Sequence, residues 1–169
     1  MQDFDFLFIV AEVAVTLAGF AGLVTIIAQR LSSGESHAGV EAHQLRAMLI
    51  GSLLTAGFAL FPYLPIRLGL PTDIAFRLSS FCFLVAWIAA LAAAWPTVRS
   101  LRASGEYASP PPLFYVNMAV HGSSVVALAL ASAGVFGPAA GAAYLCALFA
   151  SLYISGSLFV GLYVSLARG

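Results

Sequence analysis

An almost uninterrupted apolar stretch over residues 4–28 sets the strongest limit on what this chain can fold into. At about 1.5 Å per residue, a helix of that length crosses a hydrocarbon core of roughly 30 Å. Two acids interrupt the stretch: Asp5 stands near its start, and Glu12 lies about 10 Å further along the helix axis. A carboxylate at that depth costs on the order of 2.5–3.5 kcal/mol on insertion scales. The assembled protein must therefore compensate for Glu12.

The composition agrees with a membrane location. The chain is 62% hydrophobic and only 8% charged, whereas soluble domains contain about 25% charged residues. We therefore expect an all-α integral membrane protein that forms a single transmembrane domain over 1–169. The acidic N-terminus lacks the basic region of a secretory signal peptide, so we expect none.

Apolar segments separated by proline, glycine or polar connectors predict five transmembrane helices. The predicted spans are 4–28, 45–64, 74–95, 113–136 and 139–166. Pro96 is expected to close the third span, and Gly137 with Pro138 is expected to form the turn before the fifth. Five helices make a thin bundle, so we expect a homo-oligomer held together by small residues that let helices approach closely. The small residues in question are Ala11, Ala14, Ala18, Gly22 and Thr25 of the first span, Gly51, Ser52, Thr55 and Ala56 of the second, and Gly156 and Gly161 of the last.

The distribution of arginine predicts the orientation of the chain. Every basic residue is an arginine, which favours a bacterial source, and an odd number of spans puts the two termini on opposite sides. Arginine is enriched on the side of the first connector, the third connector and the C-terminus. That side carries Arg30, Arg46, Arg99, Arg102 and Arg168, whereas the other carries Arg67 and Arg77. The positive-inside rule then predicts a bacterial inner membrane protein with its N-terminus outside and its C-terminus in the cytoplasm.

One stripe of the first helix gathers polar and small residues. At about 100° per residue, the stripe comprises Asp5, Glu12, Thr16, Gly19, Leu23, Ile26 and Ile27. In a pore, Glu12 would form an ion-binding or proton-accepting ring beneath an outer collar of Asp5. Leu23 with Ile26 and Ile27 would form an apolar gate that closes by losing water. The alternatives are a structural carboxyl at Glu12, an ordinary interfacial charge at Asp5 and plain core packing for the apolar residues.

A second polar line lies on the fourth span, where Asn117, His121 and Ser124 recur at helical spacing. His121, with Asn117, is a candidate proton relay or a metal or haem ligand. The alternative is a histidine that only makes hydrogen bonds between helices. One histidine does not supply the three or four ligands that a metal needs, so we predict no metal site. Trp87 and the other large aromatic residues are interpreted as interfacial or packing residues.

The segment TLAGFAGL at residues 16–23, preceded by Glu12, resembles a pattern in small multi-span bacterial membrane proteins. Its central part, LAGFA, is also similar to the pore-lining first helix of Orai calcium channels. Those channels are oligomers of four-span subunits with this helix at the axis, so the resemblance implies that the first span lines an axis. Orai channels carry their selectivity glutamate about two turns after the glycine, where this chain has Ile27. The resemblance therefore does not extend to calcium selectivity.

The leading functional hypothesis is a homo-oligomeric channel or channel-like conduit for cations or protons. Its expected partners are the lipid bilayer, other copies of the same chain and the permeating cation. We expect no enzymatic activity, no cofactor and no nucleic-acid partner. The alternative is a non-conducting structural or signalling subunit that acts with a partner protein. A third hypothesis is a membrane redox protein or enzyme that uses His121.

Overall fold

Apolar helices account for most of the chain. The computed structural model describes the backbone of residues 2–31, 38–104 and 112–166, and the side chains of residues 5–24, 42–104 and 114–160. In chain order the helices are α1 (Gln2–Leu31), α2 (Ala38–Leu60), α3 (Tyr63–Arg67), α4 (Thr72–Ala103), α5 (Pro112–Ser132), the 3₁₀ turn η1 (Gly137–Ala139) and α6 (Ala140–Leu166). Five of them are long and apolar enough to cross a membrane, and no strand occurs in the described backbone. The prediction of an all-α chain with five helices of spanning length is confirmed.

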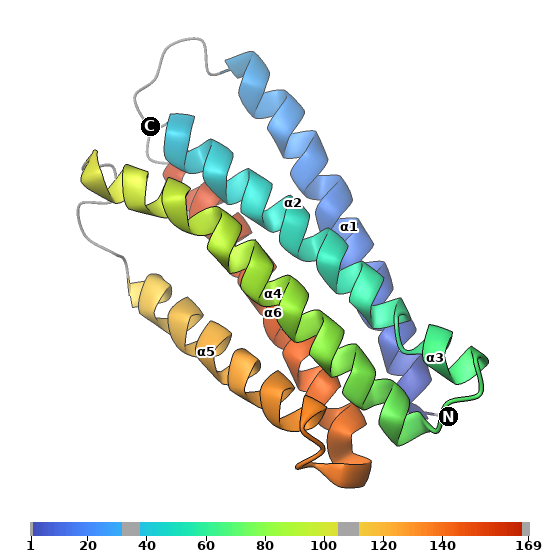
Figure 1. Ribbon diagram of the computed structural model, residues 1–169. Coiled ribbons are helices and arrows are strands. Elements are labelled where there is room, and N and C mark those ends of the chain that lie inside the picture. The colour runs from blue at the N-terminus through green and yellow to red at the C-terminus, as the bar shows by residue number, and fades with distance from the viewer. Residues whose placement is uncertain (1, 32–37, 105–111, 167–169) are drawn as a thin grey trace.

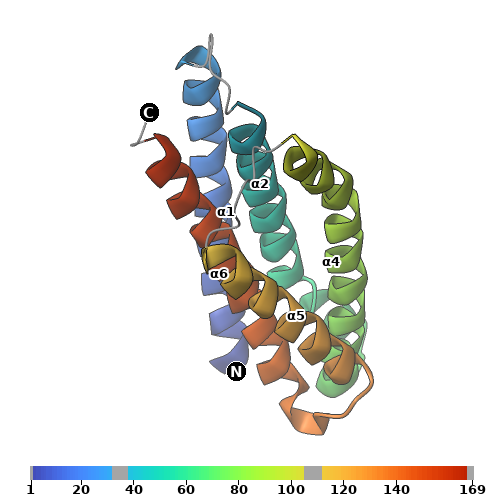
Figure 2. The ribbon, with the colours of Figure 1, turned by 90° about the vertical axis from the view of Figure 1, so that its left-hand side faces the viewer.

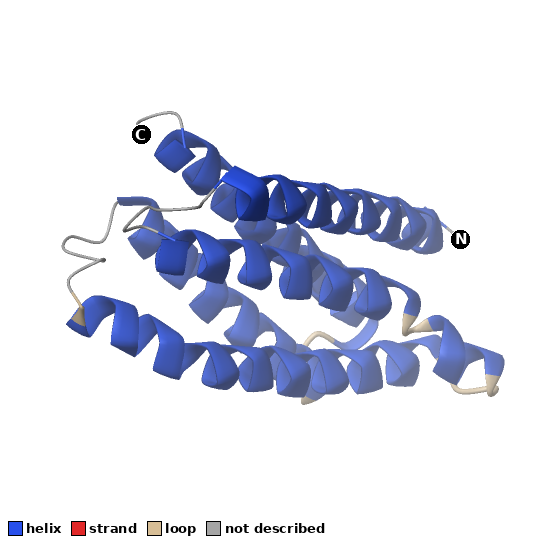
Figure 3. Ribbon diagram, turned by 90° about the horizontal axis from the view of Figure 1, so that it is seen from above, coloured by secondary structure: helices blue, strands red, loops and turns tan. Residues whose placement is uncertain are grey.

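The five long helices run alternately up and down in one bundle (Figures 1 and 2). Helix α6 packs against each of the other long helices, whereas α1 packs mainly against α2 and less extensively against α6. Helix α1 is therefore an edge helix, and in Figure 3 it is the helix that begins at the N label, on one side of the bundle. The N-terminus lies at the end of the bundle that holds α3 and η1, and the C-terminus lies at the other end (Figure 2). We call these the N-terminal and C-terminal ends of the bundle.

A cluster of aromatic rings packs between α2, α4 and α6 in the half of the bundle nearer the N-terminal end. Phe83 of α4 stacks on Phe58 of α2 with centroids 4.8 Å apart, and its ring also lies 5.1 Å from Trp87 and 5.9 Å from Tyr144. The buried hydroxyl of Tyr144 donates a hydrogen bond of 2.5 Å to the backbone carbonyl of Phe58. Pro62, four residues after Phe58, has no N–H to offer that carbonyl. Tyr144 thus replaces the hydrogen bond that Pro62 removes.

Glycine is required at the turn that follows α5. Gly134 has a φ of +79°, a conformation that side chains disfavour. The N–H of Gly134 bonds to the carbonyl of Ala131, and the N–H of Val135 bonds to that of Leu130, both at 3.0 Å. This pair of bonds is a Schellman motif, which satisfies the free carbonyls at the helix end. A Cβ at Gly134 would also lie 2.7 Å from the guanidinium carbon of Arg77, so the turn and the start of α4 meet closely.

Several boundaries differ from the predicted ones. The predicted span 45–64 starts earlier, at Ala38, and its helix ends at Leu60, before the separate α3. Helix α4 does not end at Pro96 but continues to Ala103. The fixed φ of proline is compatible with a helix, and at this exposed site the chain continues although Pro96 removes one intrahelical hydrogen bond and crowds the carbonyl four residues earlier. Helix α5 ends at Ser132, so the turn before α6 begins earlier than the predicted Gly137-Pro138 pair, which instead forms part of η1.

Most of the small residues predicted to drive self-association pack within the chain. Gly22 and Gly156 are half-buried beside open space, and Thr25 and Gly161 lie outside the described side chains, so their part in self-association stays a prediction. The packed ones on α1 and α2 are buried, or half-buried in the case of Gly51. They are Ala11, Ala14, Ala18, Gly51, Ser52, Thr55 and Ala56. A Cβ at Gly51 would lie 3.1 Å from Ser155 Oγ of α6, and Thr55 Oγ1 lies 2.6 Å from Ser151 Oγ. Small side chains predict that two helices approach closely, but not which two.

Candidate functional site

The polar stripe of α1 lies on the outer face of the bundle. Its residues with described side chains are all exposed: Asp5, Glu12, Thr16, Gly19 and Leu23. No atom comes within 4 Å of where a Cβ would stand at Gly19, so the face is open there. Ile26 and Ile27 lie on the same helix, but their side chains are outside the described residues. From Asp5 to Leu23, the stripe is therefore a surface of the bundle and is not part of its core.

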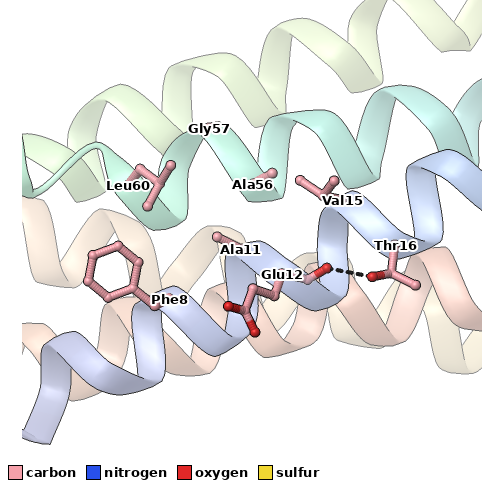
Figure 4. A pocket seen from close by; sticks show the side chains of 8 residues that line it. All are labelled: Phe8, Ala11, Glu12, Val15, Thr16, Ala56, Gly57 and Leu60. Carbon is pink, nitrogen blue, oxygen red and sulfur yellow. Dashed lines mark hydrogen bonds between the residues drawn. The ribbon is translucent and has the colours of Figure 1, made fainter.

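Glu12 lines a shallow groove between α1 and α2 (Figure 4). The groove is otherwise apolar, apart from the Thr16 hydroxyl, and its lining comprises Phe8, Ala11, Glu12, Val15 and Thr16 of α1 with Ala56, Gly57 and Leu60 of α2. The Thr16 hydroxyl donates to the backbone carbonyl of Glu12 at 2.8 Å and makes no hydrogen bond to the Glu12 carboxylate. Within the described residues, the carboxylate has no hydrogen bond and no ion pair.

The depth of Glu12 makes this arrangement costly for an isolated subunit. In the segment Asp5–Val24, which is apolar enough to span, Glu12 lies about 10 Å from one end and about 18 Å from the other. In a bilayer, a carboxylate on this outer wall would carry an insertion cost of up to about 2.5–3.5 kcal/mol, and no described side chain offsets it. Water, a cation or another protein surface against this face would remove that cost.

A second polar region lies inside the bundle. A cavity of about 590 Å³ opens between α2, α4, α5 and α6, and most of its wall is apolar. Its larger polar lining residues are His43, Gln44, Arg46, Arg102, Asn117 and His121. None of the described lining residues is acidic. Arg46 lies near the start of α2 and Arg102 near the end of α4, so both arginines belong to the C-terminal end of the bundle.

His121 is held by a tryptophan on the neighbouring helix. Trp87 Nε1 of α4 donates to His121 Nδ1 of α5 at 2.9 Å, and the two rings meet edge to face. An indole N–H can only donate, so Nδ1 must accept and the imidazole carries its proton on Nε2. In the described residues Nε2 has no hydrogen-bond partner. His121 therefore offers a free N–H donor to the cavity that it lines.

The predicted polar line on the fourth span divides into two parts. Asn117 lines the cavity with His121, and Ser157 Oγ of α6 lies 3.1 Å from its Oδ1. Ser124 is buried and donates to its own backbone, at the Val120 carbonyl. Only Asn117 and His121 face the cavity, and Ser124 is a structural residue.

Glu12 and His121 belong to separate sites. Glu12 lines the outer groove between α1 and α2, whereas His121 lines the cavity within the bundle, and the two linings share no residue. The structure thus does not bring the two most distinctive titratable groups of the chain together in one subunit. Nor do three or more histidine, cysteine or acidic side chains cluster anywhere in the part of the chain whose side chains are described.

Sequence reasoning missed the partner of His121 and the two arginines of the cavity. Trp87 is a packing residue, as one of its two interpretations has it, because its side chain is buried in the core. Its place near the middle of α4, about 22 Å from either helix end, argues against an interfacial tryptophan, but no sequence pattern indicates its hydrogen bond to His121. Arg102 lies over the ring of Phe114, 4.9 Å from its centroid, a contact that no sequence pattern indicated. Comparison with known proteins adds no further constraint, since no family model, curated protein or solved structure matches the chain.

Proposed function

We propose that this protein is a homo-oligomeric membrane conduit for cations or protons, in which α1 of each subunit lines the central axis. One observation carries the proposal: the carboxylate of Glu12 is exposed on the outer wall of the subunit at spanning depth, without a partner in the described residues. A shared aqueous axis removes the cost of that position, because each carboxylate then faces water or a cation instead of lipid.

The position of α1 in the bundle supports this role. As an edge helix it packs mainly against α2, and its other face is available to neighbouring subunits. In the proposed assembly Asp5 forms an outer collar, Glu12 forms the ring that binds the cation or proton, and Leu23 contributes to an apolar gate. Ile26 and Ile27 follow on the same helix and belong to the same proposed gate.

We further propose a bacterial inner membrane location with the N-terminus outside. The argument is the arginine asymmetry, which is consistent with the bundle. Arg46, Arg99 and Arg102 belong to its C-terminal end, whereas Arg67 and Arg77 belong to its N-terminal end. The positive-inside rule makes the C-terminal end cytoplasmic.

Ion flux into proteoliposomes tests the conduit. Vesicles loaded with a pH-sensitive or a potassium-sensitive dye should report flux for the unmodified protein and at least about tenfold less for Glu12→Gln, since losing about 1.4 kcal/mol of cation binding costs a factor of ten. Asp73→Asn is the matched control, because Asp73 is an exposed acid on α4, outside the stripe. It should conduct normally. Equal flux through the unmodified protein and Glu12→Gln, or no flux through either, contradicts the proposal.

The oligomeric state provides an independent check. Subunit counting by photobleaching of single labelled particles should give a fixed number above one in lipid. A monomer, or a particle with an equimolar second protein, favours the non-conducting subunit instead. In that case a polar or basic side chain of the partner would meet Glu12.

A further inference from the structure

The cavity between α2, α4, α5 and α6 has no place in the proposed conduit, yet it has the features of a binding site. At about 590 Å³ it falls within the range of roughly 300–1,000 Å³ that small-molecule sites occupy. Its wall is mostly apolar, with a few polar groups, which is the usual composition of such sites. We propose that this cavity binds an anionic amphiphile, with its carboxylate or phosphate head at Arg46 and Arg102 and its apolar body inside the bundle.

The mouth of the cavity selects a negative charge. Arg46 and Arg102 line it from two different helices, and no acidic residue is found in the described lining to neutralise them. Guanidinium groups match carboxylate and phosphate oxygens with paired hydrogen bonds. Packing over Phe114 holds the Arg102 guanidinium at the entrance to α5. Both arginines are exposed, so a head group can reach them.

The depth of the cavity selects an apolar chain. Its walls are formed by aliphatic and aromatic side chains, among them Leu91, Ile154 and Leu158, and it reaches Phe83 and Trp87. Phe83 belongs to the aromatic cluster with Phe58 and Tyr144, which closes this end of the site. A chain that enters from the arginines therefore ends against aromatic rings.

The free donors along the wall add a finer preference. His121 presents its Nε2–H, and the amide nitrogen of Asn117 has no hydrogen-bond partner in the described residues. An unpartnered donor in an apolar cavity is costly, and an acceptor oxygen on the ligand body satisfies it. The preferred ligand thus carries an oxygen function on its chain in addition to the anionic head.

The two tryptophans of the chain provide a direct assay. Trp87 lines the cavity, whereas Trp95 is exposed and lies outside the lining. Trp95→Phe leaves Trp87 as a reporter inside the site, and Trp87→Phe leaves Trp95 as a reporter of the lipid phase. The probe is stearate with a nitroxide group at mid-chain, which supplies a head, a chain, an acceptor oxygen and a fluorescence quencher.

In nanodiscs, the probe should quench Trp95→Phe saturably, and unlabelled stearate should reverse the quenching. Trp87→Phe should show only weak quenching that does not saturate. The methyl ester of stearate should compete at least about tenfold more weakly, since it lacks the charge-assisted hydrogen bonds. Equal, non-saturating quenching of both variants overturns the proposal, and so does competition by inorganic phosphate as strong as that by stearate, because it would indicate an ion site alone.

Substitution of the arginines distinguishes specific recognition of the anionic head from non-specific binding of the apolar chain. Arg46→Gln combined with Arg102→Gln should weaken probe binding at least about tenfold, and Arg99→Gln should leave it unchanged. Arg99 is the matched control because it is exposed, three residues from Arg102 and outside the lining. All these variants alter exposed side chains, and a normal elution profile checks their folding. Unchanged affinity in the double variant overturns the proposal, whatever the outcome of the flux assay with Glu12.

Discussion

Glu12 on the outer face of α1 and His121 on the wall of the cavity are both polar side chains at spanning depth, yet their surroundings differ in kind. The carboxylate of Glu12 has no partner in the described residues, and the residue beside it, Thr16, bonds to backbone instead. His121 is held in one tautomer by Trp87 and lies among other hydrogen-bonding groups. The polar groups inside the bundle are thus partly paired with one another, whereas the carboxylate of Glu12 has no partner among the described residues.

The same contrast appears in the backbone contacts. Inside, the Tyr144 hydroxyl replaces a hydrogen bond that Pro62 removes, and Gly51 lies close to Ser155. On the outer face, Gly19 has open space around it. Substitutions inside should therefore change the free energy of unfolding, and those on the α1 face should change assembly and conduction.

The largest loss of stability is expected for Tyr144→Ala. The side chain is fully buried among Phe76 and Phe83, so truncation should lower the free energy of unfolding by about 3–5 kcal/mol. Tyr144→Phe keeps the ring, and the Phe58 carbonyl still accepts from the Phe61 N–H at 3.3 Å, so loss of the phenol hydrogen bond should cost about 0.5–1.5 kcal/mol. Unfolding in mixed micelles, followed by circular dichroism, measures both. A Phe variant as stable as the unmodified protein would show that this carbonyl needs no replacement donor.

The next largest effect concerns Glu12 itself. Replacing it with leucine should make insertion of the first helix more favourable by about 3 kcal/mol, because a carboxylate is removed from the bilayer interior. Glycosylation mapping of residues 4–28 in a host protein measures the insertion free energy. Thr16→Leu, on the same exposed face, should produce a much smaller gain. An unchanged insertion energy for Glu12→Leu would mean that the helix sits in the bilayer with this residue near the interface, and the contrast with the cavity would disappear.

The properties that sequence predicted well are local ones. Hydropathy and the positions of proline and glycine predicted five helices of spanning length, and the helical period predicted that Asp5, Glu12 and Thr16 share one face. Whether that face carries ions stays a prediction. What sequence could not supply was the choice of partner between distant segments. The contact between Trp87 and His121 joins residues that are 34 apart in the chain.

The alanine ridge of α1 illustrates the same limit. Ala11, Ala14 and Ala18 have the spacing of a close helix contact, and all three are buried within the same chain, where α1 packs against α2 and α6. Similarly, the sequence positions of Arg46 and Arg102 indicate only the orientation of the chain, whereas the fold places both side chains in the lining of one cavity. A pattern on one helix describes the kind of neighbour that fits it, and the identity of that neighbour depends on the packing of the whole bundle.

A smaller loss is expected for Thr55→Val, which conserves shape and removes the hydroxyl between α2 and α6. Thr55 Oγ1 lies 2.6 Å from Ser151 Oγ, and hydrogen bonds between membrane helices contribute about 0.6 kcal/mol on average and up to about 1.7 kcal/mol. Unfolding in mixed micelles should show a loss in that range. Ser123→Ala is the control, because Ser123 is exposed and bonds only to the backbone of its own helix, and it should have no effect. An equal loss in both variants would remove the distinction between inner and outer hydroxyls.

The smallest effect on folding, and the sharpest test of the outer face, is expected for Gly19→Ala. Alanine favours a helix over glycine by about 1 kcal/mol, and nothing lies within 4 Å of the new methyl group in the subunit. The free energy of unfolding should therefore stay the same or rise by up to about 1 kcal/mol, whereas Gly134→Ala should lower it, since the φ of that residue is +79° and Arg77 lies against it. If α1 faces a shared axis, the added methyl groups narrow that axis once per subunit, and ion flux in proteoliposomes should fall although the protein is no less stable. Unchanged flux with unchanged stability would mean that this face meets only lipid, and Glu12 would then need a different explanation.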